Sequence, residues 1–171
     1  MIKIVICDDE IHYQNKLEME LNEFAKDKYY LDIVKISTGI QMINYFKKEN
    51  DIDIIFLDVH MPNIDGMEVA KELRKIGYRD EIIFYTHSKP EVFEAFDVDA
   101  FHYIIKEETD KIRRESIYQK AIDEARKQKE NFISVACAGK SKIIPLAKIM
   151  YFKVSKSIVY IYLEDGSVVD F

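Results

Sequence analysis

The sequence has few of the residues that build linkers or covalent frameworks: 5 glycines, 3 prolines and 2 cysteines occur among 171 residues, and tryptophan is absent. So few glycines and prolines leave little room for a disordered linker, and we expect a compact chain. Cys7 and Cys137 have neither the spacing of a metal site nor that of a disulfide framework, so both are predicted to be buried thiols. No apolar run approaches the roughly 18 residues of a membrane span, and acidic residues interrupt the first apolar run before it could form a signal peptide. These absences predict a cytoplasmic protein with no membrane partner.

Charge is distributed unevenly along the chain. The formal net charge is -6, yet residues 131–171 contain five lysines against three acidic residues. A change of sign along the chain is what two modules with different partners would show, one for signalling and one that meets a polyanion.

Five apolar runs of strand length alternate with helical patterns in the first part of the chain. The runs span residues 2–7, 31–36, 52–57, 82–85 and 101–105. Continuous runs rich in Ile and Val suit strands that are covered on both faces. Of the helices between them, the third is expected to end at Gly77 and the fourth to begin near Pro90, and a fifth helical stretch covers about residues 109–129. With right-handed crossovers this order gives an α/β fold, a doubly wound five-stranded parallel sheet, with its functional crevice at the carboxyl ends of the strands.

After Asn131 the pattern changes to short β-rich pieces separated by turn signals. The pieces span residues 132–136, 142–144, 149–154, 158–163 and 167–171. They predict a partial all-β antiparallel segment. Because its last strand would be left with partners missing, we expect the segment to be the start of a domain that continues in a longer protein.

Acidic residues follow two of the predicted strands. Asp8 and Asp9 come after the first strand and Asp58 closes the third, and these strand ends are adjacent in a doubly wound sheet. Carboxylates in one crevice repel each other unless a cation neutralises them, and Mg²⁺ takes oxygen ligands. The pattern therefore predicts a magnesium site, although Asp8 and Asp9 taken alone would also suit a helix cap.

Two other functional groups lie at neighbouring strand ends. Lys106 ends the fifth strand and Thr86 ends the fourth. With Asp58 and a metal, they would supply a carboxylate nucleophile, a fixed cation and a hydroxyl donor for phosphoryl transfer. The alternative is that Lys106 is a solvated strand-end lysine and that Thr86 and Tyr103 only fill a half-buried strand surface. The four histidines lack metal-ligand spacing and are predicted to be surface or edge residues.

In four stretches the sequence resembles the receiver family of two-component response regulators. The stretches are Cys7-Asp8-Asp9-Glu10, residues 57–66 (LDVHMPNIDG), residues 83–86 (IFYT) and residues 103–106 (YIIK). The resemblance covers about residues 1–125 and implies the flavodoxin-like receiver fold. It also implies that Asp58 is the phosphorylated residue. Mg²⁺ would be held by Asp9, Asp58 and the backbone carbonyl of His60, with Asp8 assisting through water.

The same resemblance implies a switch. Lys106 and Thr86 would stabilise the phosphoryl group, and Thr86 and Tyr103 would form the switch pair. In the family the phosphoryl group draws the threonine hydroxyl inward, the aromatic ring follows, and the face formed by the fourth helix, fifth strand and fifth helix changes shape and forms a homodimer. The implied donor is a sensor histidine kinase, and the domain would catalyse only its own phosphorylation and dephosphorylation.

The chain departs from the family pattern at two positions. Lys106 is followed by Glu107 and Glu108 where the family usually has proline, and His87 stands where many relatives have alanine or glycine. These departures bear on the placement of the lysine and on access to the phosphoryl group. They support an alternative function, an unphosphorylated receiver that acts as a protein-protein interaction scaffold. A haloacid-dehalogenase-type phosphohydrolase would need a second aspartate where this chain has His60.

Residues 132–171 resemble the start of a LytTR-type DNA-binding domain. The matching pattern of apolar segments lies at residues 132–135, 143–146, 149–152 and 158–162, followed by Asp165-Gly166. This resemblance implies a receiver domain at 1–125, a helical linker at 126–131 and an incomplete LytTR-like domain at 132–171. Lys153, Lys156 and Ser157 would lie on the first DNA-facing loop, unless the lysines are only solubilising charges. The full-length protein would regulate transcription, with DNA as a partner of that full-length form only.

Overall fold

The structure is a computed structural model that describes residues 1–89, 94–137 and 140–170. The chain forms two compact units, Met1–Ala125 and Arg126–Phe171. Within the described residues, no helix is both long and apolar enough to cross a membrane.

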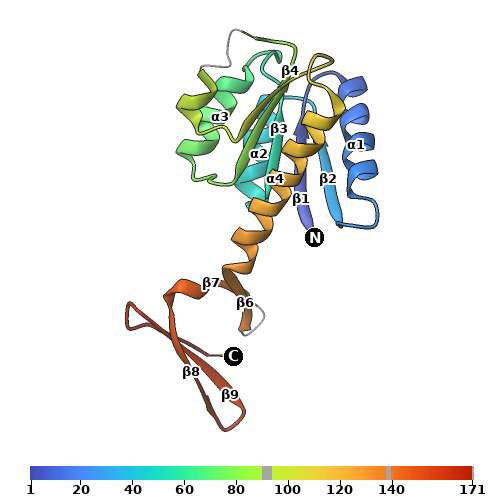
Figure 1. The fold of residues 1–171 in the computed structure, drawn as a ribbon. Coiled ribbons are helices and arrows are strands. Elements are labelled where there is room, and N and C mark those ends of the chain that lie inside the picture. The colour runs from blue at the N-terminus through green and yellow to red at the C-terminus, as the bar shows by residue number, and fades with distance from the viewer. Residues whose placement is uncertain (90–93, 138–139, 171) are drawn as a thin grey trace. The chain divides into compact units, whose positions relative to one another are not determined.

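The first unit alternates strands and helices (Figure 1). Its elements are β1 (Ile2–Cys7), α1 (Ile11–Ala25), β2 (Leu31–Ile36), α2 (Gly39–Lys48), β3 (Ile54–Leu57), α3 (Gly66–Lys75), β4 (Glu81–Thr86), the 3₁₀ helix η2 (Glu94–Val98), β5 (His102–Ile105) and α4 (Lys111–Glu130), which continues into the second unit. The strands form one parallel sheet in the order β2-β1-β3-β4-β5. The predicted doubly wound five-stranded sheet is therefore confirmed.

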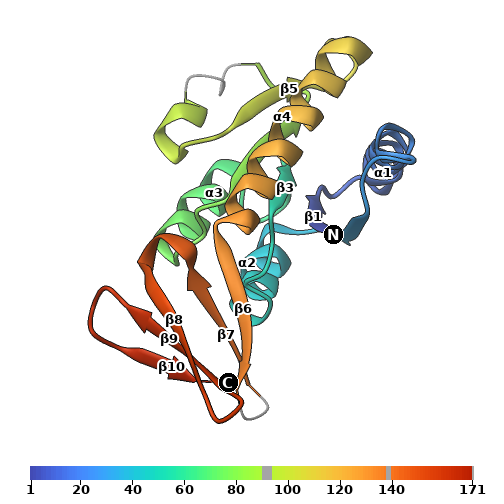
Figure 2. The same ribbon diagram turned by 60° about the horizontal axis from the view of Figure 1, so that its bottom comes forward.

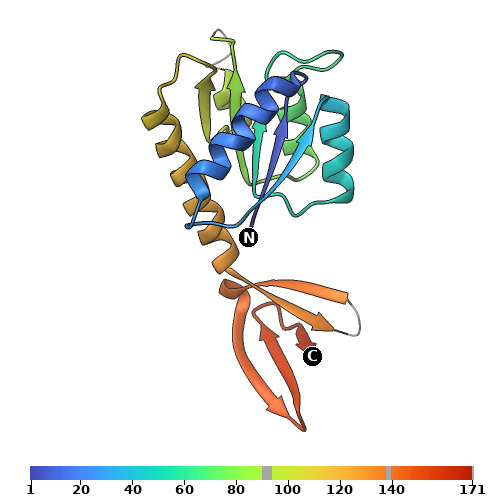
Figure 3. The same cartoon turned by 90° about the vertical axis from the view of Figure 1, so that its right-hand side faces the viewer.

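Helices cover both faces of this sheet, and the alternation of side chains along β1 shows how. Ile2, Ile4 and Ile6 point to a core shared with α1 and α4, whereas Val5 and Cys7 point to a core shared with α2 and α3. Figure 3 shows α1 lying across one face of the strands. Because both faces are buried, these strands are apolar at successive positions instead of alternating with polar residues.

Several boundaries differ from the sequence-based prediction for local reasons. β3 begins at Ile54 and not at Ile52. Just before it, Asp53 meets Lys3 twice: its N–H donates to the Lys3 carbonyl at 2.9 Å, and its side chain accepts the Lys3 N–H at 2.7 Å. α4 begins at Lys111 because the carboxylate of Asp110 caps it, accepting the N–H of Arg113 at 2.9 Å. The predicted end of the third helix is confirmed, since Gly77 follows α3 with φ +105.

The predicted fourth helix differs most. Its expected start at Pro90 lies outside the described residues, and the part that is described is the short η2. Cys7 is buried as predicted, whereas the side chain of Cys137 is outside the described part of the structure.

The second unit is antiparallel β structure, which confirms the predicted class of this segment (Figure 2). β6 (Phe132–Cys137) pairs with β7 (Lys140–Pro145), and η3 (Leu146–Lys148) leads to a sheet of β8 (Ile149–Ser155), β9 (Ile158–Leu163) and β10 (Val168–Asp170). Its core is small, with five buried apolar residues among those described: Val135, Ile144, Ile161, Leu163 and Val169.

Candidate functional site

The first and third strands end side by side. Cys7 pairs with Leu57 in the register of β1 and β3, and the N–H of Asp58 donates to the carbonyl of Cys7 at 2.9 Å. The residues that follow, Asp8 and Asp58, are therefore neighbours at the carboxyl edge of the sheet. This is where a doubly wound fold places its binding crevice.

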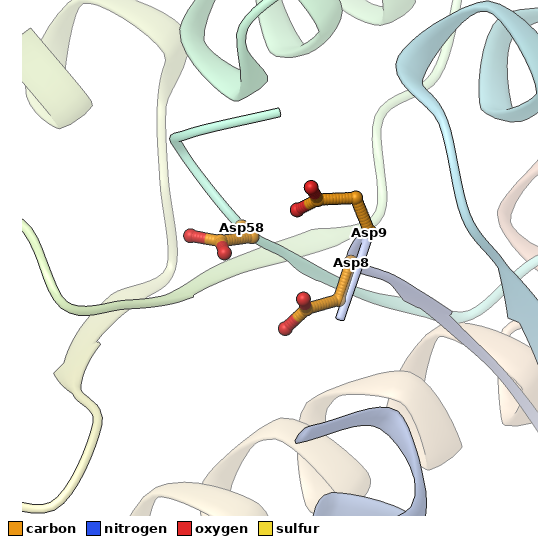
Figure 4. Close-up of side chains that lie close together, drawn as sticks. All are labelled: Asp8, Asp9 and Asp58. Atoms are coloured by element: carbon orange, nitrogen blue, oxygen red, sulfur yellow. The ribbon is translucent and has the colours of Figure 1, made fainter. Parts of the chain in front are cut away.

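Three carboxylates gather at this edge. Asp8, Asp9 and Asp58 each offer one oxygen, and these oxygens lie within 4.8 Å of one another. Figure 4 shows the three side chains together, with the carboxyl groups of Asp8 and Asp9 both turned to the side on which Asp58 lies. Asp8 and Asp58 are buried and Asp9 is exposed, so the cluster is open to solvent on the side of Asp9. The structure thus brings together the three carboxylates that the sequence predicted as neighbours.

Lys106 reaches the cluster from the end of β5. Its ammonium nitrogen lies 2.8 Å from Oδ2 of Asp58 and 2.7 Å from Oδ2 of Asp8. The backbone N–H of Lys106 donates to the carbonyl of Thr86 at 2.7 Å, which extends the pairing of β5 with β4 to the residue that carries the ammonium. The alternative of a solvated strand-end lysine is excluded, because the side chain of Lys106 is 0% exposed.

Burial and charge act in opposite directions on these groups. Burial raises the pKa of the Asp8 carboxyl, an effect that the hydrogen bonds from Lys106 and from the Glu10 amide only partly offset. Burial also lowers the pKa of Lys106, but its hydrogen bonds with Asp58 and Asp8 and their charges outweigh burial, so the pKa is raised. Lys106 therefore stays charged at neutral pH.

Two buried oxygens of the cluster, Oδ2 of Asp8 and Oδ1 of Asp58, have no hydrogen bond among the described residues, and of these Oδ2 of Asp8 lies in the ion pair with Lys106. Oδ1 of Asp58 makes no hydrogen bond with any described residue, although Asp58 is only 5% exposed. A buried carboxylate oxygen without a partner is costly unless a cation or another group meets it.

The loop after β3 is shaped by Gly66. A Cβ atom at this position would lie 2.0 Å from the carbonyl oxygen of Asp58, and the N–H of Gly66 donates to the carbonyl of Val59 at 2.7 Å. Only glycine permits this approach, so the glycine holds the backbone beside the acidic cluster. His60 lies within this loop with its side chain exposed.

Thr86 and Tyr103 are connected through Ser88. Oγ1 of Thr86 accepts the N–H of Ser88 at 3.2 Å, and the hydroxyl of Tyr103 donates to the carbonyl of Ser88 at 2.9 Å. Thr86 is fully buried and Tyr103 is half-buried. The sequence did not indicate Ser88, because it connects the two residues through its backbone N–H and carbonyl and not through its side chain.

Two residues of α1 contact the cluster and were also missed as site residues. Nε2 of Gln14 donates to the carbonyl of Asp8 at 2.6 Å, and the ring centroid of Tyr13 lies 4.3 Å from the ammonium nitrogen of Lys106. In the sequence, Tyr13 shares the helical spacing of Leu17 and Leu21, a pattern that indicates a core residue. The signal for Gln14 was a polar residue three positions before the buried Leu17, on the helix face that turns inward.

The remaining candidates are the histidines and three residues of the second unit. His12, His60 and His87 are exposed and His102 is half-buried on β5, as expected for surface or edge histidines. In the second unit, Lys153 lies on β8, and Lys156 and Ser157 form the turn before β9; all three are exposed. DNA contact by these three residues stays a prediction.

Comparison with known proteins identifies the first unit. Residues 4–117 match the response regulator receiver domain family. The chain belongs to this family. As a receiver, it shows 31% identity over 106 residues to the transcriptional regulatory protein YpdB of Escherichia coli, covering 61% of this chain and 41% of YpdB. The chain thus spans about two fifths of the length of such curated relatives.

A longer match includes the second unit. The sensory transduction protein LytT of Bacillus subtilis is 26% identical over 180 residues, covering 98% of this chain and 68% of LytT. The second unit is compatible with a LytTR-type domain. Among solved structures, the response regulator TrrA of Thermotoga maritima in complex with Mg²⁺ and BeF is similar to the receiver, with TM-score 0.59 and 28% identity, covering 71% of this chain and 99% of TrrA.

Proposed function

We propose that the receiver is a phosphorylation switch in which Asp58 accepts a phosphoryl group from a sensor histidine kinase. The observation that carries the proposal is the position of Asp58, between two further carboxylates and the buried ammonium of Lys106 at the carboxyl edge of the sheet. A receiver with this arrangement has a nucleophile, ligands for a cation and a fixed positive charge in one crevice.

The donor set fits Mg²⁺. Three carboxylates share one crevice with a single ammonium, and Oδ1 of Asp58 is buried without a hydrogen-bond donor among the described residues. Hard oxygen ligands of this kind suit Mg²⁺, and the similar receiver TrrA is described as a complex with Mg²⁺ and BeF. Asp9, Asp58 and the backbone carbonyl of His60 would hold the ion, with Asp8 acting through water. When bound, it would neutralise the carboxylates and the charge on the incoming phosphoryl oxygens.

The protein groups have separate parts in the reaction. An oxygen of Asp58 forms a bond to phosphorus as the bond from phosphorus to the donor nitrogen of the kinase histidine breaks, which gives an acyl phosphate on Asp58. The ammonium of Lys106 and the hydroxyl of Thr86 would stabilise the charge spread over the phosphoryl oxygens. Lys106 needs little movement for this role, since its nitrogen is already 2.8 Å from Asp58.

The switch would run from Thr86 to Tyr103. An inward hydrogen bond from the Thr86 hydroxyl to the phosphoryl group would compete with the present contact between its Oγ1 and the N–H of Ser88. The carbonyl of Ser88 in turn accepts the hydroxyl of Tyr103. The face affected is formed by η2, β5 and the start of α4, where Phe96 and Ile112 are 75% and 82% exposed. We infer that this face forms the homodimer and that phosphorylation biases it.

The output would lie in the second unit. Its similarity to LytT over the whole chain supports a LytTR-type domain that binds DNA in the full-length protein and regulates transcription. The two halves of the proposal are independent, since the receiver could be phosphorylated without the DNA-binding part.

Intact-mass measurement with acetyl phosphate tests the receiver. The chain should gain one phosphoryl group with Mg²⁺ and none with excess chelator, and Asp58→Asn should gain none under either condition. A wild-type chain that stays unmodified at every Mg²⁺ concentration would favour the alternative, a receiver that acts as an unphosphorylated interaction scaffold.

A further inference from the structure

The ammonium of Lys106 has an aromatic neighbour as well as its two carboxylates. Its nitrogen lies 4.3 Å from the ring centroid of Tyr13 and 5.5 Å from that of Tyr85, within the range of cation–π attraction. An ammonium group has three N–H donors. The two carboxylates of Asp8 and Asp58 take part of this capacity, and the ring of Tyr13 meets the group without taking a conventional hydrogen bond.

The ring of Tyr13 is itself held from two elements. The N–H of Tyr13 donates to the carbonyl of Glu10 at 3.0 Å in the first turn of α1. The ring makes a T-shaped contact with the ring of His87, in the loop after β4, at a centroid distance of 4.9 Å and an angle of 71°. It also meets His12 at 5.2 Å and 69°. Contacts of this geometry favour a fixed ring orientation.

The residue after Lys106 does little to fix the position of the lysine. Glu107 has a positive φ of 65 and is exposed, and its ion pair with Lys16 spans 3.8 Å between exposed side chains, so it contributes little. The buried end of the Lys106 side chain therefore depends on the groups around the ammonium. Among these groups, Asp8 would interact with a bound cation as well as with Lys106. The ring of Tyr13 would interact with Lys106 alone.

We propose that Tyr13 is a positioning residue whose ring holds the ammonium of Lys106 beside Asp58. The inference rests on the proposed phosphorylation of Asp58, because it gives Tyr13 a part in that reaction. The role belongs to the ring and not to the hydroxyl. The proposal also gives the bulky His87 a function in this chain, because its ring contacts the ring of Tyr13 and supports its orientation.

The test compares three variants of the full chain: Tyr13→Phe keeps the ring, Tyr13→Leu removes it, and Tyr30→Leu makes the same change at an exposed tyrosine of the first unit. The probe is beryllium fluoride with saturating Mg²⁺, and its affinity is measured by calorimetry. We expect Tyr13→Phe and Tyr30→Leu to bind within about twofold of wild type and Tyr13→Leu to bind about tenfold more weakly, as loss of a desolvated cation–π contact predicts. The Mg²⁺ affinity alone should stay within about twofold in all variants, since the proposed ligands are unchanged.

A second measurement reports the contact without any phosphoryl mimic. The side-chain NMR signals of Lys106 next to its ammonium should show a ring-current shift in wild type and in Tyr13→Phe, and the shift should be lost in Tyr13→Leu. Equal beryllium fluoride affinities for wild type and Tyr13→Leu would overturn the inference, as would an equal loss in Tyr13→Phe and Tyr13→Leu. If wild type itself binds no beryllium fluoride, the proposed phosphorylation fails, whereas binding that is insensitive to Tyr13 refutes only the positioning role.

Discussion

The hydroxyl of Tyr103 donates a 2.9 Å hydrogen bond to the backbone carbonyl of Ser88, the residue whose N–H is accepted by Thr86. The end of β4 and the exposed side of β5 are thereby joined through one residue. The ring of Tyr103 also packs against Phe84 at a centroid distance of 5.6 Å. A displacement of Thr86 can therefore shift Tyr103, because both residues are hydrogen-bonded to Ser88.

Tyr103→Phe isolates the hydroxyl from the ring. The variant loses the hydrogen bond to Ser88 and keeps the packing against Phe84, so we expect the free energy of unfolding to fall by about 1 kcal/mol. Urea denaturation measures this change, with Tyr30→Phe as the control at a side chain that is 74% exposed. Equal losses in the two variants would show that the Tyr103 hydroxyl contributes nothing to the fold.

Asp8→Asn tests the repulsion within the acidic cluster. Burial raises the pKa of Asp8, which means that folding favours its uncharged form; the associated stability is lost as the pH rises through the raised pKa. At pH 7.5 without Mg²⁺, the variant should therefore be more stable than wild type towards urea.

Mg²⁺ should stabilise wild type more than Asp8→Asn. Addition of the ion is expected to raise the unfolding temperature of wild type clearly and that of Asp8→Asn much less, because one proposed partner of the ion has lost its charge. Asp51→Asn, an exposed residue before β3, should respond to Mg²⁺ as wild type does. An equal gain with Mg²⁺ in wild type and Asp8→Asn would contradict a role for Asp8 in the site.

Glu81 predicts a pH dependence at the other end of the sheet. Burial raises the pKa of its carboxyl from 4.5 to about 7, with Glu124 and Asp80 adding repulsion and Arg74 opposing it. Since the folded-state pKa is raised, the stabilising effect is complete below about pH 4.5 and is lost as the pH rises to about 7.

Glu81→Gln should remove this part of the pH profile. We expect the variant to gain about 1–2 kcal/mol over wild type at pH 8, after allowance for partial solvent screening, and to lose that advantage at pH 4.5. Urea unfolding of both chains across this range gives the difference directly, with other titrating groups cancelling. A difference that does not change with pH would show that Glu81 titrates normally in the folded chain.

The parallel sheet could be predicted because its strands are buried on both faces. Runs such as Ile2 to Cys7 are apolar at every position but one, and that pattern needs helices on both sides. The start of β3 could not be predicted from apolar character, because Ile52 is as deeply buried as Ile54 although it lies outside the strand. The helix expected from Pro90 rested on a short apolar stripe, and only its last part, the 3₁₀ helix η2, is described.

The candidate site was predictable to the extent that it follows strand ends. Asp8, Asp58 and Lys106 each come directly after a strand of the same parallel sheet, so topology alone places them together. Tyr13 and Ser88 were not predictable in this way. The contact of Tyr13 depends on how α1 is oriented over the sheet, and that of Ser88 depends on backbone atoms whose direction the sequence does not indicate.

The measurement that tests the central claim most directly is the location of the phosphoryl group. The chain is treated with acetyl phosphate and Mg²⁺ and then with borohydride, which reduces an aspartyl phosphate to homoserine, and its peptides are sequenced by mass spectrometry. Homoserine at position 58 in wild type, and at no position in Asp58→Asn, is the predicted result. Reduction at Asp8 or Asp9 with Asp58 intact, or no reduced residue in the wild-type chain, would contradict the assignment of Asp58 as the phosphoryl acceptor.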